Sequence, residues 1–434
     1  MHNKLKIATL VAVAFSLSVT VANAQNKQDS PNLLTRISDP ASEAGLLRRI
    51  AGKCAWRDFM ESSEEAGVEV ILSATSVYQL NTRKGTMPGA TSTRAGRFTG
   101  TYDLEVNLDL AKIAGLKGAE IRILAEGGFG SGIGATSVGS IMDPNAAAYS
   151  DHAIAITEFY YHQSLFDGRV KFRIGKFDIT GGYSCRHCDV AFDTNSYAND
   201  ETAQFLNSAL VNNPTIPFPD KGLGASIYAM PVDGWYLAAG VADTGAVATQ
   251  TGFNTAFKKG ASAIYLFETG ITPMIGKLGG AYRVGFWLDT TDKERFTNGK
   301  IKNRDMGIYA SFDQMLYREN PSVEDDSQGL GAFFRAGFAD PNVNDIHKFF
   351  SAGVSYQGLI PGRDEDTFAV GYAYSKAGYN PEFTAKNEQL WEVYYSAQLT
   401  PYLAVTPNFQ YIKNPGMGEV RDTTVWGVRV QLTF

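Results

Sequence analysis

Charge is scarce in this chain, because Asp, Glu, Lys and Arg make up only 19% of its 434 residues. Soluble domains carry roughly 25%. The formal charge of −6 argues against a broadly basic nucleic-acid binder. Three cysteines are too few for a disulfide scaffold of this length. No run of 18 apolar residues follows residue 24, so no membrane helix is expected. Aromatic residues are plentiful at 12%, and together these features indicate a β-barrel in a membrane.

The first 24 residues have the features of a secretory signal peptide. Lys4 and Lys6 supply the positive start, and residues 7–21 form an apolar run softened only by Thr and Ser. Residues 22–24 (Ala-Asn-Ala) form a cleavage site, after which the mature chain would begin at Gln25. An N-terminal membrane anchor is the alternative, but the run is short for one. The signal predicts export into an oxidising compartment.

From Gly67 onward, successive runs alternate apolar side chains with polar or small ones. This period of two places one set of side chains on each face of a β-strand. The last run is the clearest, with one face formed by Trp426, Val428, Val430, Leu432 and Phe434. Sixteen such runs occur, at 67–80, 98–109, 118–130, 154–166, 170–178, 222–231, 235–244, 261–272, 279–290, 305–313, 329–339, 348–357, 366–374, 388–399, 402–411 and 423–434.

The even number of runs favours a transmembrane antiparallel β-barrel of 16 strands, because bacterial outer-membrane barrels have even strand numbers, short periplasmic turns and long external loops. A soluble β-sandwich also alternates, but its chain rarely continues the pattern for so long. The predicted organisation is a signal peptide (1–24), a partly helical periplasmic segment (25–66) and the barrel (67–434). The longest external connection is 179–221, whereas the acidic 314–328 would face the periplasm.

Several short motifs occur in order along the barrel region, and their order and spacing form a set. They are Gln-Ser-Leu-Phe-Asp-Gly at 163–168, Phe-Asp-Thr-Asn at 192–195, Gln-Phe-Leu-Asn at 204–207, Pro-Phe-Pro at 217–219, Asp-Gly-Trp at 233–235 and Pro-Asn-Phe-Gln-Tyr at 407–411. With these motifs the chain resembles the carbohydrate-selective porins of the OprB type. The resemblance implies a sugar-permeable, water-filled channel in the outer membrane. A general non-selective porin and a structural or adhesin-like barrel are the alternatives.

The chemistry expected in such a channel is recognition of polar solutes rather than catalysis. Charged side chains are favoured on the inner face, because a cation at the lipid midplane would be destabilised by roughly 2–4 kcal/mol. Strand alternation predicts that the pore lining contains Arg122, Glu126, Arg173, Arg283, Arg335, Glu392 and Arg429. The alternative is that these charges pair across strands and only stabilise a wet wall.

Connection 179–221 is predicted to fold into the lumen as the constriction, since it is long and mixes acids, amides and aromatics. Asp193 and Asn195 are the predicted partners of sugar hydroxyls, with Phe192 or Tyr197 as the stacking surface. The alternative leaves this connection on the outer rim, where the wall alone sets selectivity.

Cys185 and Cys188 flank Arg-His in the same connection. A local disulfide is favoured by the oxidising compartment, while a redox pair or two zinc ligands are the alternatives. His162 and Ser164 have the spacing of a barrel lipase but lie near the periplasmic turn at Asp167, so no catalytic residues are predicted. No metal or cofactor is predicted either. The expected partners are carbohydrate solutes and outer-membrane lipid, without nucleic acid, and both a monomer and a homotrimer are compatible with the sequence.

Overall fold

The computed structural model describes most of the chain after its first 59 residues. The described residues are 60, 62–83, 96–149, 153–185, 189–320, 323, 326–418 and 420–434. The predicted signal peptide and nearly all of the predicted periplasmic segment lie outside these residues.

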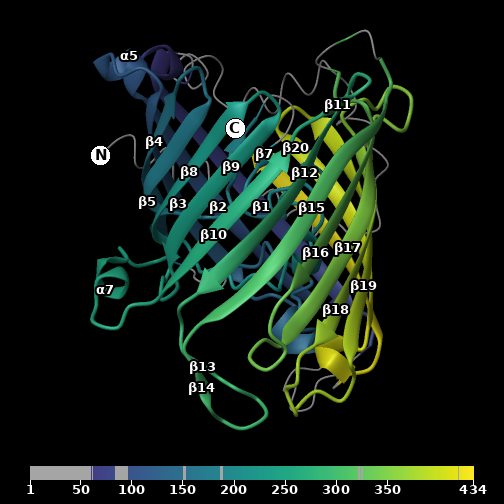
Figure 1. Ribbon diagram of the computed structural model, residues 1–434. Helices are drawn as coiled ribbons and strands as arrows, with labels where there is room; N and C mark the ends of the chain where they lie inside the picture. Colours follow the sequence, from purple (N-terminus) through teal and green to yellow (C-terminus); the bar gives the residue numbers. More distant parts are fainter. Residues whose placement is uncertain are drawn as a thin grey trace.

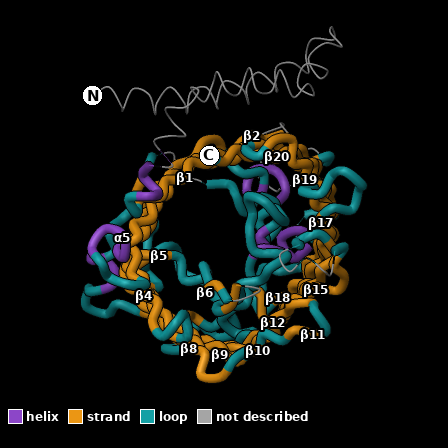
Figure 2. The backbone as a smooth tube through the Cα atoms, turned by 90° about the horizontal axis from the view of Figure 1, so that it is seen from above, coloured by secondary structure: helices purple, strands orange, loops and turns teal. Residues whose placement is uncertain are grey.

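A closed antiparallel barrel of sixteen strands forms the body of the molecule (Figures 1 and 2). Each strand pairs with its neighbours in sequence, and β21 pairs with β1 to close the wall. The wall strands are β1 (Val68–Asn81), β2 (Gly96–Asp109), β3 (Ala119–Gly130), β4 (Ala155–Leu165), β5 (Val170–Phe177), β8 (Gly222–Val232), β9 (Trp235–Asp243), β10 (Ala263–Ile271), β12 (Leu278–Asp289), β15 (Asp305–Arg318), β16 (Gly329–Phe338), β17 (Ile346–Gln357), β18 (Thr367–Ala377), β19 (Asn387–Thr400), β20 (Leu403–Lys413) and β21 (Thr423–Thr433).

The predicted strand number is confirmed, and each strand overlaps one of the sixteen predicted runs. The largest difference is at β15, which continues to Arg318 instead of ending at Asp313. A register shift between Met315 and Tyr317 explains the difference, because a bulge breaks the two-residue alternation on which the prediction depends. The following periplasmic connection is correspondingly shorter than predicted.

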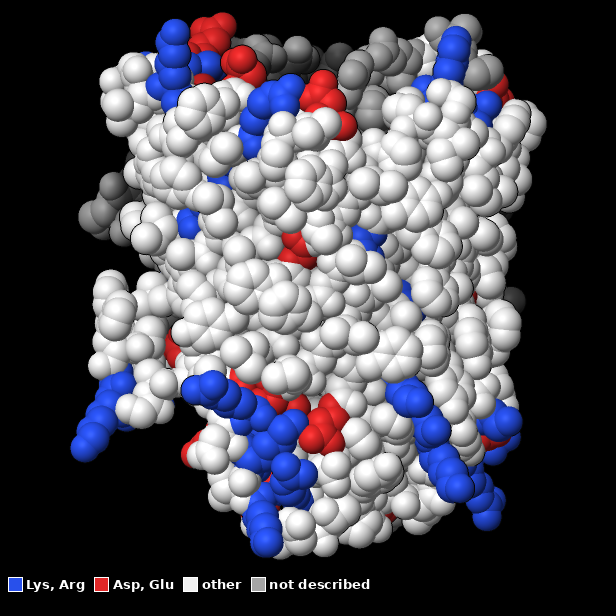
Figure 3. Space-filling model, viewed as in Figure 1, with Lys and Arg blue, Asp and Glu red and all other residues white. Residues whose placement is uncertain are grey.

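The outer face of the barrel is apolar, as a lipid-facing surface must be. Large side chains exposed on this face include Ile174, Val284, Phe286, Ile308 and Trp391. In Figure 3 charged side chains gather at the two ends of the barrel, with a broad and mostly uncharged band between them. None of the described helices is long and apolar enough to span a membrane.

The connections differ in length at the two ends of the barrel (Figure 1). One end carries the C-terminus, tight turns, the two-residue strand β11 (Met274–Ile275) and helix α5 (Leu110–Ala114). It is called the periplasmic end, because the short turns of outer-membrane barrels face the periplasm. The opposite, external end carries α7 (Phe253–Ala256) and the hairpin of β13 (Lys293–Glu294) and β14 (Ile301–Lys302). The short elements η1 (Gly134–Val138) and η2 (Pro415–Gly418) also belong to external connections.

Candidate functional site

The connection between β5 and β8, residues 178–221, is called the inner loop below, and its described residues, 178–185 and 189–221, lie inside the barrel. It contains β6 (Tyr183–Ser184), β7 (Asp189–Val190) and helix α6 (Ser208–Val211). Figure 2, which looks along the barrel, shows β6 within the ring of strands. Its hydrophobic side chains are buried against the inner wall, with Phe205 and Leu210 both at 0% exposure. The lumen is therefore partly filled by chain, as the sequence predicted for this connection.

Glycines on the inner wall make room for the inner loop. The clearest example is Gly331 on β16, where an added Cβ would lie 2.0 Å from the ring of Tyr197. On β18, a Cβ added to Gly371 would lie 2.8 Å from both Phe205 and Leu210. Because such distances are far shorter than van der Waals contact, any larger residue at these wall positions would force the loop side chains to shift.

Arg335 on β16 forms the first buried anchor of the inner loop. Its Nη1 donates to the carbonyl of Leu210 at 2.6 Å, and its Nη2 donates to the carbonyl of Asp193 at 3.0 Å. The Asp193 carboxylate lies 3.3 Å from Nε of Arg335 and also accepts from the amide of Asn213 at 2.7 Å. Burial raises the pKa of Asp193 to about 6, and the neighbouring Arg335 opposes that rise. Wall and loop thus share one buried charge pair.

The backbone next to this anchor is strained. Ala191, Phe192 and Asp193 have φ values of 83°, 56° and 75°, in the left-handed region that is unfavourable for residues other than glycine. All three residues are buried. The contacts of this segment with the wall must therefore stabilise a conformation that it would not keep in water.

Arg283 on β12 forms a second anchor beside the first. It donates to the carbonyl of Asp189 at 3.1 Å and to the carboxylate of Asp313 at 2.7 Å. Nearby, the Nδ2 atom of Asn195 donates to the carbonyl of Phe312 at 3.2 Å. These bonds connect the first half of the inner loop to β12 and β15.

Glu392 and Arg429 anchor the second half of the inner loop on β19 and β21. The Glu392 carboxylate accepts the backbone amides of Leu206 at 2.7 Å and Asn207 at 2.9 Å. Arg429 donates to the carbonyls of Glu201 at 2.8 Å and Gln204 at 2.9 Å. The inner loop is consequently held along most of its length by side chains of the wall.

The structure revises the surroundings of seven of the predicted site residues. They are 2% exposed or less and lie between wall and loop, and they are Phe192, Asp193, Asn195, Arg283, Arg335, Glu392 and Arg429. The strand residues among them point inward, as alternation predicts. Alternation does not reveal what covers the inner face, and here the inner loop covers it. These side chains therefore contact protein rather than the open lumen, and their contact with sugar stays untested.

The inner wall of β2 to β5 differs, because some of its inward charges remain accessible. Arg122 on β3 is 41% exposed and pairs with Glu120 at 3.3 Å. Arg173 on β5 lies over the ring of Tyr183 at 4.6 Å from its centroid. Accessible inward side chains require open space in front of them, so the free part of the lumen lies along these strands.

Charged residues from wall and loop meet across this open part of the lumen. The ammonium of Lys221, at the end of the inner loop, hydrogen-bonds Glu126 on β3 and lies 3.7 Å from Glu158 on β4. Glu201 of the inner loop is only partly exposed, and its burial raises its pKa to about 7. Asp103 on β2 also contributes a carboxylate that points inward. Carboxylates thus predominate where the lumen is free.

Sequence reasoning placed Glu126, Arg122 and Arg173 on this wall but missed Asp103, Glu158 and Lys221 as site residues. Alternation could have found the two acids, since both occupy inward positions of their strands. No local pattern marks Lys221, which precedes β8.

Two further points from the sequence concern the pairing of Cys185 with Cys188 and the possibility of a metal site. Cys188 lies outside the described residues, so the structure does not test its pairing with Cys185. Among the residues that the structure describes, no group of three His, Cys, Asp or Glu side chains is arranged to hold a metal ion.

Comparison with known proteins gives a consistent result. The profile of the carbohydrate-selective porin family, OprB, matches residues 93–434. Porin B of Pseudomonas aeruginosa is 24% identical over 392 residues, covering 79% of this chain and 83% of its own. Putative porin QuiX of Acinetobacter baylyi is 24% identical over 421 residues, covering 87% and 92%. The high-pH structure of Pseudomonas putida OprB superposes with a TM-score of 0.73 at 20% identity, covering 87% of this chain and 97% of that one.

Proposed function

The chain belongs to the carbohydrate-selective porin family, OprB, and from this premise we propose that sugars cross through the free lumen beside β2 to β5, with the inner loop as the constriction. The protein is a sugar-selective porin of the outer membrane. The proposal concerns the route within it. Its main support is that the inner loop is fixed on one side of the lumen while accessible charges line the other.

The chemistry of this route suits neutral, hydroxyl-rich solutes. Carboxylates such as Asp103, Glu126 and Glu201 accept hydrogen bonds from sugar hydroxyls, and Arg122 and Arg173 donate to hydroxyl oxygens. The excess of carboxylates disfavours entry of anions. A neutral solute meets no such repulsion and exchanges its water hydrogen bonds for bonds to the wall.

We also propose that the protein catalyses no reaction, since the inward polar groups are engaged in anchoring the inner loop or in lining the route. A homotrimer is a further proposal.

The route is tested by replacing residues 191–204 of the inner loop with a short Gly-Ser linker. Single-channel conductance in planar bilayers should rise, and block of the current by the preferred sugar should disappear. Liposome swelling with a series of sugars, amino acids and organic acids identifies that sugar beforehand.

The matched control replaces residues 293–302, the β13–β14 hairpin, which projects from the external end (Figure 1). Its conductance and sugar block should equal those of the wild type. Unchanged conductance and sugar block in the 191–204 variant, with a barrel that still shows a heat-dependent shift in electrophoresis, would place the constriction elsewhere.

A further inference from the structure

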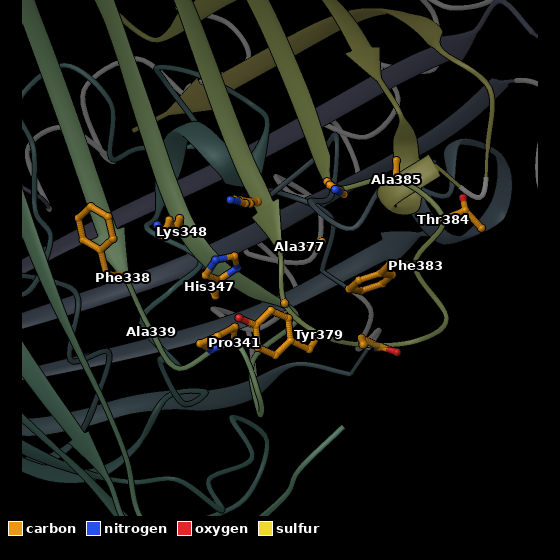
Figure 4. A pocket seen from close by; sticks show the side chains of 14 residues that line it. Phe338, Ala339, Pro341, His347, Lys348, Ala377, Tyr379, Phe383, Thr384 and Ala385 are labelled. Carbon is orange, nitrogen blue, oxygen red and sulfur yellow. The ribbon is translucent and has the colours of Figure 1, made fainter. Parts of the chain in front are cut away.

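A basic pocket lies at the external rim of the barrel, remote from the solute route. Its volume is about 660 Å³, and it is formed by the external ends of β17 and β18 with the connections 339–345 and 378–386. Three lysines line it: Lys348, Lys376 and Lys386. Figure 4 shows Lys348 and His347 on β17 facing the same space as Tyr379 and Phe383.

The lysines of this pocket are not neutralised by the protein. Lys348 and Lys376 are directly opposite each other in the β17–β18 register, an arrangement that is destabilising for like charges. Among the described residues, none of the three lysines forms an ion pair with a carboxylate. His347 is 8% exposed, and its buried Nδ1 atom finds no hydrogen-bond partner in the described part of the chain. The pocket therefore combines three positive charges with the unpartnered Nδ1 atom of His347.

The position of the pocket relative to the membrane indicates what neutralises this charge. Lys348 and Lys376 share the outward face of their strands with Phe350 and Tyr374, which are paired two residues further into the barrel. Two residues further in, Tyr372 is opposite Trp391 on β19, which is 49% exposed. Such rows of aromatic side chains mark the boundary between hydrocarbon and headgroups, so the two lysines lie at headgroup level of the outer leaflet.

We propose that this pocket binds the phosphorylated headgroup of an anionic glycolipid of the outer leaflet. A phosphate accepts hydrogen bonds from several ammonium groups at once. The attraction of Lys348 and Lys376 to one bound phosphate would therefore offset the repulsion between them. The rings of Tyr379 and Phe383 offer apolar faces for the sugar to which the phosphate is attached. A lipid is favoured over a soluble phosphorylated sugar because both lysines point to the lipid side of the wall.

The test uses the full-length porin in detergent, with bisphosphorylated lipid A as the probe and the same lipid without its phosphates for comparison. The K348Q/K376Q variant should bind the bisphosphorylated lipid about 25-fold more weakly, at about fivefold per lysine removed. The control K258Q/K259Q removes two exposed lysines from another external connection and should change affinity less than twofold. The wild type and the K348Q/K376Q variant should bind the dephosphorylated lipid with equal affinity.

Two results would overturn the proposal. One is equal affinity of wild type and K348Q/K376Q for the bisphosphorylated lipid. The other is displacement of that lipid by glucose 6-phosphate at a similar concentration, which would make the pocket a site for a soluble ligand. Should the double variant fail to form a barrel, K386Q, whose substitution lies in a connection, gives the same comparison with a loss of about fivefold.

Discussion

Replacing Arg335 with Met should release the inner loop from the wall without unfolding the barrel. The substitution removes the donors to the carbonyls of Leu210 and Asp193 and leaves the Asp193 carboxylate buried without its cation. Breaking a buried pair by removing one partner typically destabilises by about 3–5 kcal/mol. Here the weakened state is the docked inner loop, because the sixteen strand pairings do not depend on this side chain.

That free energy corresponds to a rise of more than about a hundredfold in the population of undocked loops. Single-channel recordings should therefore show frequent current fluctuations that the wild type lacks, and block by sugar should weaken. The D193N/R335M variant should fluctuate less than R335M, because no charge then remains buried without a partner. Arg363 is the matched control, since it pairs with Asp366 at 2.7 Å but is 39% exposed. The R363M variant should behave as the wild type.

Quiet currents and wild-type sugar block in folded R335M protein would refute this reasoning. They would show that the remaining contacts hold the inner loop without Arg335. Equal fluctuation in R335M and D193N/R335M would refute only the electrostatic part, and would assign the effect to the two lost carbonyl bonds.

Three further predictions concern other parts of the barrel. The G331V variant should loosen the inner loop and give noisy currents, because its side chain would collide with Tyr197, whereas G245A, which meets only ordinary contacts, should not. Cation preference, measured as a reversal potential, should fall between pH 8.5 and 5.5 as Glu201, with a pKa of about 7, becomes protonated, and E201Q should show a smaller fall over the same range. Deleting Phe434, whose backbone amide donates to Leu72 at 2.8 Å beyond the end of β21, should reduce assembly of heat-resistant barrel in the outer membrane.

The strands could be predicted from the sequence because each barrel strand faces lipid on one side and the interior on the other. The two environments require apolar and polar side chains to alternate along the strand. This alternation predicts the bounds of strands such as β21 within a residue or two. The alternation fails at the bulge between Met315 and Tyr317, where the backbone itself is irregular.

The packing of the inner loop could not be predicted in the same way. Alternation assigns Arg283 and Glu392 to the inner face but cannot tell an inward residue in water from one beneath a loop. The inward glycines, such as Gly331 and Gly371, were nonetheless a usable signal. Glycine within a strand often marks a position where another segment of the chain approaches closely. The pairing of Lys221 with Glu126 joins residues 95 positions apart and leaves no local trace.

The one-sided packing of the lumen has a consequence for how such a channel can be redesigned. The exposed polar side chains that a solute meets come mainly from β2 to β5, a continuous stretch of the chain, while the later strands serve as the bed of the inner loop. A chimera that exchanges only residues 96–130, which form β2 and β3, with those of a related barrel would alter the surface that solutes encounter and leave the buried anchors on β12, β16, β19 and β21 intact. The connection 131–153 has to stay, because Ala146 donates to the carbonyl of Leu206 at 2.8 Å and Ser208 donates to the carbonyl of Asp143 at 3.0 Å. Solute preference and loop anchorage are thus encoded in separable tracts of one barrel, and each can be varied while the other is kept constant.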